Sequence, residues 1–240
     1  AAVLKRLAAE GSAALHTGPV ADDLVRRVRE HPTNPGRMTA GDLVGYRPVV
    51  REPLCTDWRA YRVCGFPPPS SGHLAVMQIL GLLDAMGPQA PGATADGPSS
   101  AAFLHRYTEA ARLAFADRAQ YVADPDFVSA PAGDWRSLLT SPYLKARSQQ
   151  IGTQSMKTAT PGQPSGTLTS LAPMPAQPEY GTSHISVVDT RGRAVAMTTT
   201  IEAAFGARRM VTTDPARPGG FLLNNQLTDF SLSPTDAQGR

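Results

Sequence analysis

The stretch GTSHISVVD, residues 181–189, has the pattern of a β-strand and begins with a glycine and a threonine. Its odd-numbered and even-numbered side chains fall on opposite faces, as they do in a half-buried strand. The preceding tract, residues 158–178, mixes prolines with Ser, Thr, Gly and Gln, and can bury too little apolar surface to offset its ordering entropy. We therefore expect a mobile linker that ends at Gly181. We infer that the chain is cut after this linker, so that Thr182 becomes an N-terminus.

Thr182 has the chemistry of a nucleophile that can activate itself. A threonine hydroxyl is weak at its free pKa and needs a base beside it, which the α-amino group of an N-terminal threonine supplies. Freeing that amino group requires a cut between Gly181 and Thr182. Gly181 tolerates a strained backbone, and the Thr182 hydroxyl can accept the Gly181 acyl group in an N-to-O shift. The stretch therefore allows autocatalytic cleavage before Thr182, but on local chemistry alone β propensity is the commoner explanation for a threonine that opens a strand, and cleavage is expected only from the wider pattern of motifs.

Helical periodicity dominates the chain before the linker, and strand periodicity dominates the chain after it. Thr39, followed three residues later by Asp42, predicts a capping box at the start of a short helical turn. The turn TRGR, residues 190–193, joins two strands into a hairpin. Helices followed by antiparallel strands indicate helix layers packed on sheet, an α/β (α+β) fold class. The expected helices lie within 1–15, 21–30, 74–86, 101–123 and 138–150, and the expected strands within 184–189, 194–203 and 221–230.

Cys55 and Cys64 are the only cysteines, and they flank a short turn between two predicted strands. Such a hairpin places their sulfur atoms within bridging distance, so we expect a disulfide. A disulfide would indicate an oxidising compartment, whereas two buried free thiols are the alternative. The cysteine spacing fits no zinc or redox motif, and the histidines show no metal-ligand spacing, so no metal is expected.

The composition limits the classes of partner. A hydrophobic fraction of 41% and a charged fraction of 18% indicate a globular chain. The net charge of +3 is dispersed, since adjacent basic pairs such as Arg26-Arg27 and Arg208-Arg209 are few, so nucleic-acid binding is not expected. No apolar run is long enough to span a bilayer, so we expect no membrane span in this segment.

Six motifs lie along the chain in this order: REPLCTDWRAYRV, PPPSSG, YVADPDF, TSHISVVD, TTTIEAAFG and LLNNQLTDFS. Together they closely resemble the γ-glutamyltransferase (γ-glutamyltranspeptidase, glutathione hydrolase) family of N-terminal-nucleophile hydrolases. The resemblance implies the αββα sandwich of that class, incomplete in this chain, and a chain that is the central fragment of a longer precursor. It divides the chain into a large-subunit part (1–157), a proline-rich linker that ends at the cleavage site (158–181) and a β-rich small-subunit part (182–240).

The resemblance also implies roles for five residues. Thr182 matches the catalytic threonine, and Thr200 matches the second threonine, which hydrogen-bonds and orients the nucleophile. Glu202, Gln226 and Asp229 match the groups that hold the α-amino group of the substrate, which suits carboxylate and amide oxygens. The plainer alternatives are solvation of a surface for Glu202 and Asp229, and strand propensity for Thr200.

The implied reaction is a two-step acyl transfer without a cofactor. Thr182 attacks the γ-amide carbonyl of glutathione or another γ-glutamyl donor, and the resulting ester passes to water or to an amino acid or peptide acceptor. The family further implies large and small subunits cut from one precursor, and a periplasmic or extracellular location in a bacterium. A triad of Ser183, His184 and Asp189 is rejected, because adjacent strand residues point to opposite faces.

Parts of the family's machinery have no match in this chain. They are the arginine that grips the substrate α-carboxylate and the glycine pair of the oxyanion hole, and His73 stands where a glycine usually follows PPPSSG. Loss of oxyanion donors typically lowers turnover by a factor on the order of 100 to 1,000. Two alternatives therefore stay open: a related acylase for β-lactam side chains or poly-γ-glutamate, and a catalytically inactive fragment.

Overall fold

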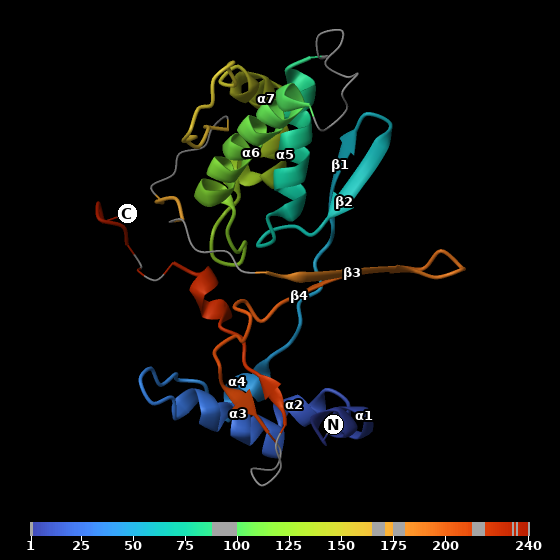
Figure 1. Cartoon of the computed structure of the whole chain (residues 1–240), viewed down its shortest axis with the longest axis vertical. Coiled ribbons are helices and arrows are strands. Elements are labelled where there is room, and N and C mark those ends of the chain that lie inside the picture. Colours follow the sequence, from blue (N-terminus) through green and yellow to red (C-terminus); the bar gives the residue numbers. More distant parts are fainter. Residues whose placement is uncertain are drawn as a thin grey trace. The chain divides into compact units, whose positions relative to one another are not determined.

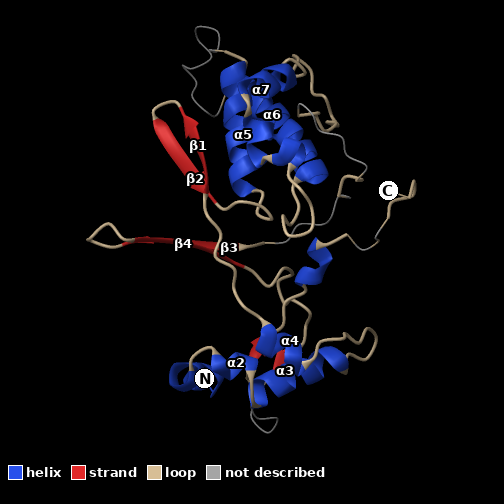
Figure 2. Cartoon of the chain, turned by 180° about the vertical axis from the view of Figure 1, so that it is seen from behind, coloured by secondary structure: helices blue, strands red, loops and turns tan. Residues whose placement is uncertain are grey.

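The computed structural model describes residues 2–87, 100–164, 171–174, 181–212, 219–231, 233 and 235–239. The chain forms two compact units, one of Ala1–Val49 with Ala176–Leu232 and one of Val50–Pro175 with Ser233–Arg240. Both contain helices and strands (Figures 1 and 2), so the chain belongs to the mixed helix-and-sheet class. The units group residues by packing, whereas the division predicted from the sequence follows a cleavage site, so the two describe different properties of the chain.

The first unit joins four helices from the start of the chain to strands from its end. Its α3 carries a buried aspartate, Asp23, whose carboxylate accepts the Thr212 N–H at 2.8 Å beside the fully buried Val211. The capping box predicted at Thr39 and Asp42 is confirmed at the start of α4. The elements are α1 (Ala2–Glu10), α2 (Ala13–His16), α3 (Pro19–Arg29), α4 (Ala40–Gly45), β3 (Ser183–Val188), β4 (Ala194–Thr199), β5 (Met210–Val211) and β6 (Phe221–Leu222).

The β3–β4 hairpin has the predicted antiparallel pairing but not the expected burial. Ser183 pairs with Thr199 and Val188 with Ala194, and Asp189 caps the turn by accepting the N–H groups of Arg191 and Arg193. Every residue of both strands is exposed, so the expectation of a half-buried strand was wrong for this chain. A strand is half-buried only if another layer covers one of its faces, and no such layer lies on this hairpin among the described residues. The uncovered apolar face consists of Ile185, Val187, Val195 and Met197.

The second unit is a helical layer with a β-hairpin beside it. Ser100 begins the long helix by accepting the Phe103 N–H at 3.2 Å, as an N-cap should. The core lies where the three helices meet and contains Ile79, Leu82, Ala110, Leu113, Ala114 and Leu144. The elements are β1 (Leu54–Trp58), β2 (Tyr61–Gly65), α5 (Gly72–Ala85), α6 (Ala101–Tyr121) and α7 (Ser141–Ser148), with 3-10 turns at Pro131–Gly133 and Trp135–Leu139.

A disulfide joins Cys55 and Cys64, which face each other in the β1–β2 ladder. His73 lies at the start of α5 and is buried against this hairpin, where its Nε2 is 3.1 Å from the Thr56 hydroxyl. A Cβ on Gly65 would come within 2.8 Å of the His73 Cβ, so the glycine leaves the room that the histidine occupies.

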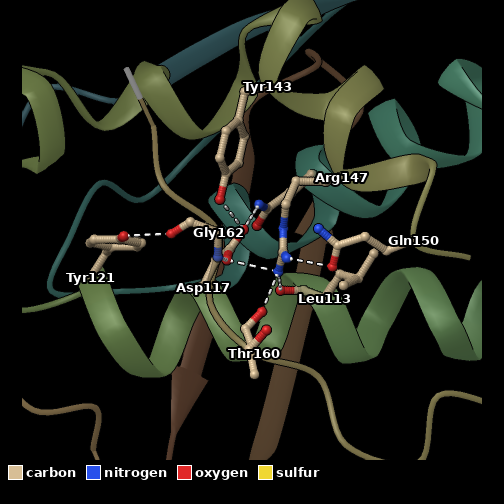
Figure 3. Close-up of polar contacts among 9 residues, drawn as sticks. Leu113, Asp117, Tyr121, Tyr143, Arg147, Gln150, Thr160 and Gly162 are labelled. Carbon is tan, nitrogen blue, oxygen red and sulfur yellow. Dashed lines mark hydrogen bonds and ion pairs between the residues drawn. The ribbon is translucent and has the colours of Figure 1, made fainter. Parts of the chain in front are cut away.

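The described part of the proline-rich segment is packed against the helical layer, unlike the mobile linker expected there. The Gly162 N–H donates to Asp117 Oδ1 at 2.7 Å, and the Gly162 carbonyl accepts from the Tyr121 hydroxyl at 2.6 Å (Figure 3). Arg147 donates to the Thr160 carbonyl at 2.9 Å. Polar backbone groups of the segment therefore find partners that composition does not reveal. Residues 165–170 and 175–180 of this segment lie outside the described part.

Asp117 is the centre of this buried network. Its carboxylate is fully buried and also accepts from Arg147 at 3.0 Å and from the Tyr143 hydroxyl at 2.7 Å (Figure 3). Burial and the nearby Asp117 charge raise the pKa of Tyr143, so its hydroxyl stays protonated and serves as a donor. α6 and α7 and the segment after α7 are thus joined through one carboxylate.

Candidate active site

Thr182 lies at the open end of the β3–β4 hairpin, directly before β3, and both it and Gly181 are exposed. The ladder pairs His184 with Thr198 and Ser183 with Thr199. The ladder ends at the Ser183–Thr199 pair, and Thr182 and Thr200 are the next residues along the two strands.

Thr200 begins a tight turn that leads to Glu202. The Glu202 N–H donates to the Thr200 Oγ1 at 2.9 Å, a local side-chain-to-backbone bond typical of threonine. Glu202 has a φ of 71°, which lies in the left-handed region that few residues other than glycine adopt. A hydroxyl can donate one hydrogen bond while it accepts others, so Thr200 keeps its donor for a second partner.

Gln226 connects the two carboxylates of the candidate site. Its Nε2 donates to Glu202 Oε2 at 3.3 Å and to Asp229 Oδ2 at 2.8 Å. Gln226 and Asp229 lie at the two ends of a short 3-10 helix, Gln226–Asp229, in which residues three apart lie one above the other. The Gln226 Oε1 is buried and has no hydrogen-bond partner among the described residues. Two carboxylates thus converge on one amide group, which is an arrangement suited to a cation with several N–H donors.

Two asparagines hold the segments that carry these groups, and the sequence reasoning assigned them no role. Asn225 Oδ1 accepts the Ala203 N–H at 3.0 Å, and Asn224 Oδ1 accepts the Gln226 N–H at 3.0 Å. The available signal was the pair Asn-Asn directly before Gln226, because asparagine side chains often bond to nearby backbone groups in turns. Gly206 follows Glu202 and Ala203 in the same loop. The Leu223 carbonyl oxygen lies so close to Gly206 that any Cβ at this position would clash with it.

The hydrogen-bond partners of His184 are not Ser183 or Asp189. Its Nδ1 lies 2.8 Å from the Thr198 hydroxyl and its Nε2 3.1 Å from the Ser186 hydroxyl, both on its own face of the hairpin. Asp189 instead caps the turn, where hydrogen bonds from Arg193 outweigh its slight desolvation and lower its pKa. The rejected triad of Ser183, His184 and Asp189 is therefore not assembled.

The described residues offer no metal site, since no group of three or more His, Cys, Asp and Glu side chains lies close enough together to hold an ion. In the same part of the chain, no helix has the length and apolar character needed to cross a membrane.

Comparison with known proteins identifies relatives along the whole chain. Residues 1–239 match the family model described as gamma-glutamyltranspeptidase. A glutathione hydrolase proenzyme of Escherichia coli is 35% identical over 231 residues, which cover 96% of this chain and 36% of the relative. The structure is also similar to a gamma-glutamyltranspeptidase from Helicobacter pylori, with a TM-score of 0.57 and 28% identity over 70% of this chain and 46% of that one.

A cephalosporin acylase from Bacillus halodurans is also similar in structure, with a TM-score of 0.72 and 25% identity. That match covers 96% of this chain and 36% of the acylase. The fold is thus shared with both kinds of enzyme, and the chain spans little more than a third of the length of the curated relatives it matches.

Proposed function

Because the chain belongs to the γ-glutamyltranspeptidase family, we propose that the complete protein hydrolyses and transfers γ-glutamyl groups through a threonyl ester at Thr182. The observation that carries this proposal is the convergence of Glu202 and Asp229 on the Gln226 amide, with Glu202 two residues after Thr200. The family match by itself supports the class of reaction. The cluster of Glu202, Gln226 and Asp229 also supports the class of substrate, because its carboxylates suit the α-ammonium group of a γ-glutamyl donor.

Cleavage before Thr182 creates the active form. The Thr182 hydroxyl attacks the Gly181 carbonyl, the peptide bond becomes an ester, and water hydrolyses the ester to leave a Gly181 carboxylate and a free Thr182 amino group. The exposed, unconstrained surroundings of Gly181 support this step, since nothing among the described residues lies within 4 Å of the Cβ position of Gly181. The products are a large subunit that ends at Gly181 and a small subunit that begins at Thr182.

In the transfer reaction the new α-amino group acts as the base. It takes the proton from the Thr182 hydroxyl as the oxygen attacks the γ-carbonyl of the donor, and it returns that proton to the departing amine. The γ-glutamyl ester then reacts with water, or with the amino group of an amino acid or short peptide, and Thr182 is restored. Thr200 orients the nucleophile, a role supported by its place directly after the strand that pairs with β3 and by a hydroxyl that accepts the Glu202 N–H and can still donate.

Gln226, Glu202 and Asp229 hold the donor by its α-ammonium group. Each carboxylate accepts a charge-assisted N–H bond from this ammonium group. The donors are glutathione and related γ-glutamyl compounds, and no cofactor takes part. The Cys55–Cys64 disulfide supports a periplasmic or extracellular location, where oxidising conditions preserve such bonds.

An acylase for other amides is the second candidate, and the similarity to a cephalosporin acylase favours it. Such an enzyme could use the same threonine but would select a different acyl group. The two candidates differ in whether the donor must carry an α-amino group. The Glu202–Gln226–Asp229 cluster supports the γ-glutamyl donor.

The test is turnover of γ-glutamyl-4-nitroanilide by the complete protein, beside glutaryl-4-nitroanilide, which lacks only the α-amino group. The proposal expects hydrolysis of the first compound, much slower hydrolysis of the second, and no hydrolysis of either by Thr182→Ala. Equal rates on both donors would favour the acylase. Activity that survives in Thr182→Ala would rule out the threonyl ester.

A further inference from the structure

The loop that carries Glu202 is held from both sides by one residue of a distant segment. Asn225 Oδ1 accepts the Ala203 N–H at 3.0 Å, and the Asn225 N–H donates to the Ile201 carbonyl at 3.3 Å. Ile201 and Ala203 are the two sequence neighbours of Glu202. Asn225 is therefore bonded to the residue before Glu202 and to the residue after it, without touching the carboxylate in any described contact.

Glu202 requires such a hold because its backbone is in an unfavourable conformation. A residue other than glycine at a φ of 71° is strained, and this conformation persists only where its surroundings impose it. The Thr200 hydroxyl fixes the Glu202 N–H, and Asn225 fixes the two neighbouring peptide groups. If the Asn225 bonds were lost, the loop could relax to negative φ, and the carboxylate would move away from Gln226.

We propose that Asn225 is a positioning residue that keeps Glu202 at the α-amino site, and that it thereby sets the preference of this site for donors with an α-ammonium group. The inference rests on the proposed function. The two asparagines then have different roles. Asn224 accepts the Gln226 N–H, whereas Asn225 holds the loop that carries Glu202. Since Asn225 acts on binding of the amino group and not on Thr182, its loss should affect KM more than kcat.

The experiment compares the complete wild-type protein with Asn225→Ala and Asn225→Asp. For each protein, the cleaved fraction is measured by intact mass, and KM and kcat are measured with γ-glutamyl-4-nitroanilide per cleaved molecule. Inhibition by L-glutamate and by glutarate, which lacks the amino group, is measured in the same assay. Asn34→Ala, in an exposed loop of the same unit, is the matched control.

Asn225→Ala should be cleaved normally. Its KM should be about tenfold higher and its kcat within about threefold of wild type, because loss of a hydrogen bond that positions a binding group typically weakens binding by roughly tenfold. The inhibition constant of L-glutamate should rise by a similar factor while that of glutarate stays unchanged. Asn225→Asp retains an acceptor for the Ala203 N–H and should recover most of the loss. Asn34→Ala should match wild type.

An unchanged KM in Asn225→Ala, or an equal loss for L-glutamate and glutarate, would overturn the proposal. A failure of Asn225→Ala to be cleaved would also overturn it, because Asn225 would then serve folding or processing. A wild-type protein without γ-glutamyl turnover would instead refute the proposed function itself. An active wild type with an equally active Asn225→Ala variant would refute only the role of Asn225 and would leave the proposed function standing.

Discussion

Glu109 illustrates what a single buried carboxylate contributes to this chain. It lies on α6 with 1% of its surface exposed, and it accepts the Met156 N–H at 2.7 Å and the Ser155 hydroxyl at 3.0 Å. Burial alone would raise the pKa of Glu109, but these hydrogen bonds and the charge of Arg112 outweigh it and lower the pKa. The ionised form is therefore the one that holds the segment after α7.

The lowered pKa predicts a pH-dependent contribution to stability. A carboxylate whose pKa is lower in the folded state stabilises fully above its unfolded value, here 4.5, and that stabilisation is lost as the pH falls through the folded pKa. Glu109→Gln should lower the free energy of unfolding by about 1–3 kcal/mol at pH 7, because an amide group meets donors there. The difference from wild type should shrink below about pH 4.

Thermal unfolding of the complete protein at several pH values checks this prediction. Glu52→Gln, which alters an exposed glutamate of the same unit, is the control and should have little effect at any pH. A difference between wild type and Glu109→Gln that is the same at pH 7 and at pH 3.5 would show that charge is not the cause.

At the scale of elements, the Asp117 network joins α6 and α7 and the segment after α7. Asp117→Ala would leave the Arg147 guanidinium, 3% exposed, without its carboxylate. Removal of one partner of a buried ion pair typically costs about 3–5 kcal/mol, whereas Tyr143→Phe removes one hydrogen bond and should cost about 1–2 kcal/mol. We also expect Asp117→Ala to release the backbone at Gly162, which bonds to this carboxylate.

Denaturant unfolding and hydrogen exchange at the Gly162 amide measure these effects. Asp126→Ala is the control, since its ion pair with Arg51 is exposed and should contribute less than about 1 kcal/mol. Asp117→Ala protein with normal stability and unchanged exchange at Gly162 would mean that the network does not anchor the segment.

Elements governed by local spacing were predictable from the sequence, and those governed by distant contacts were not. The hairpin register and the Thr39 capping box follow from periods of two and three residues along the chain. The packing of the proline-rich segment depends on Asp117, which lies more than 40 residues away from Gly162, so composition alone gave the wrong expectation.

At the candidate site, local pattern and resemblance contributed differently. The chemistry of a self-activating threonine could be argued from Gly181 and Thr182 alone. The grouping of Glu202 with Gln226 came from the resemblance, because the two are 24 residues apart and no periodicity links them. The contact between Asn225 and Ala203 could not be predicted from the sequence, because the two residues are 22 positions apart and the Asn-Asn pair indicates only local backbone contacts.

At the scale of the whole molecule, the hairpin that opens at Thr182 has an uncovered apolar face. Ile185 is 47% exposed and Val187 55%, opposite Met197 and Val195 on the partner strand. Two strands alone are marginally stable in water, and three or more strands or a packed helix are usually needed. Because the chain spans little more than a third of its relatives' length, we expect the remainder of the complete protein to cover this face and to fix the position of Thr182.

The central claim is that Thr182 becomes an N-terminus, and the most direct test is the intact mass of the denatured complete protein. Wild type should give two chains that meet between Gly181 and Thr182, Thr182→Ser should also give two because it keeps a hydroxyl, and Thr182→Ala should give one. An unbroken wild-type chain, or a cut at this bond that persists in Thr182→Ala, would contradict the account.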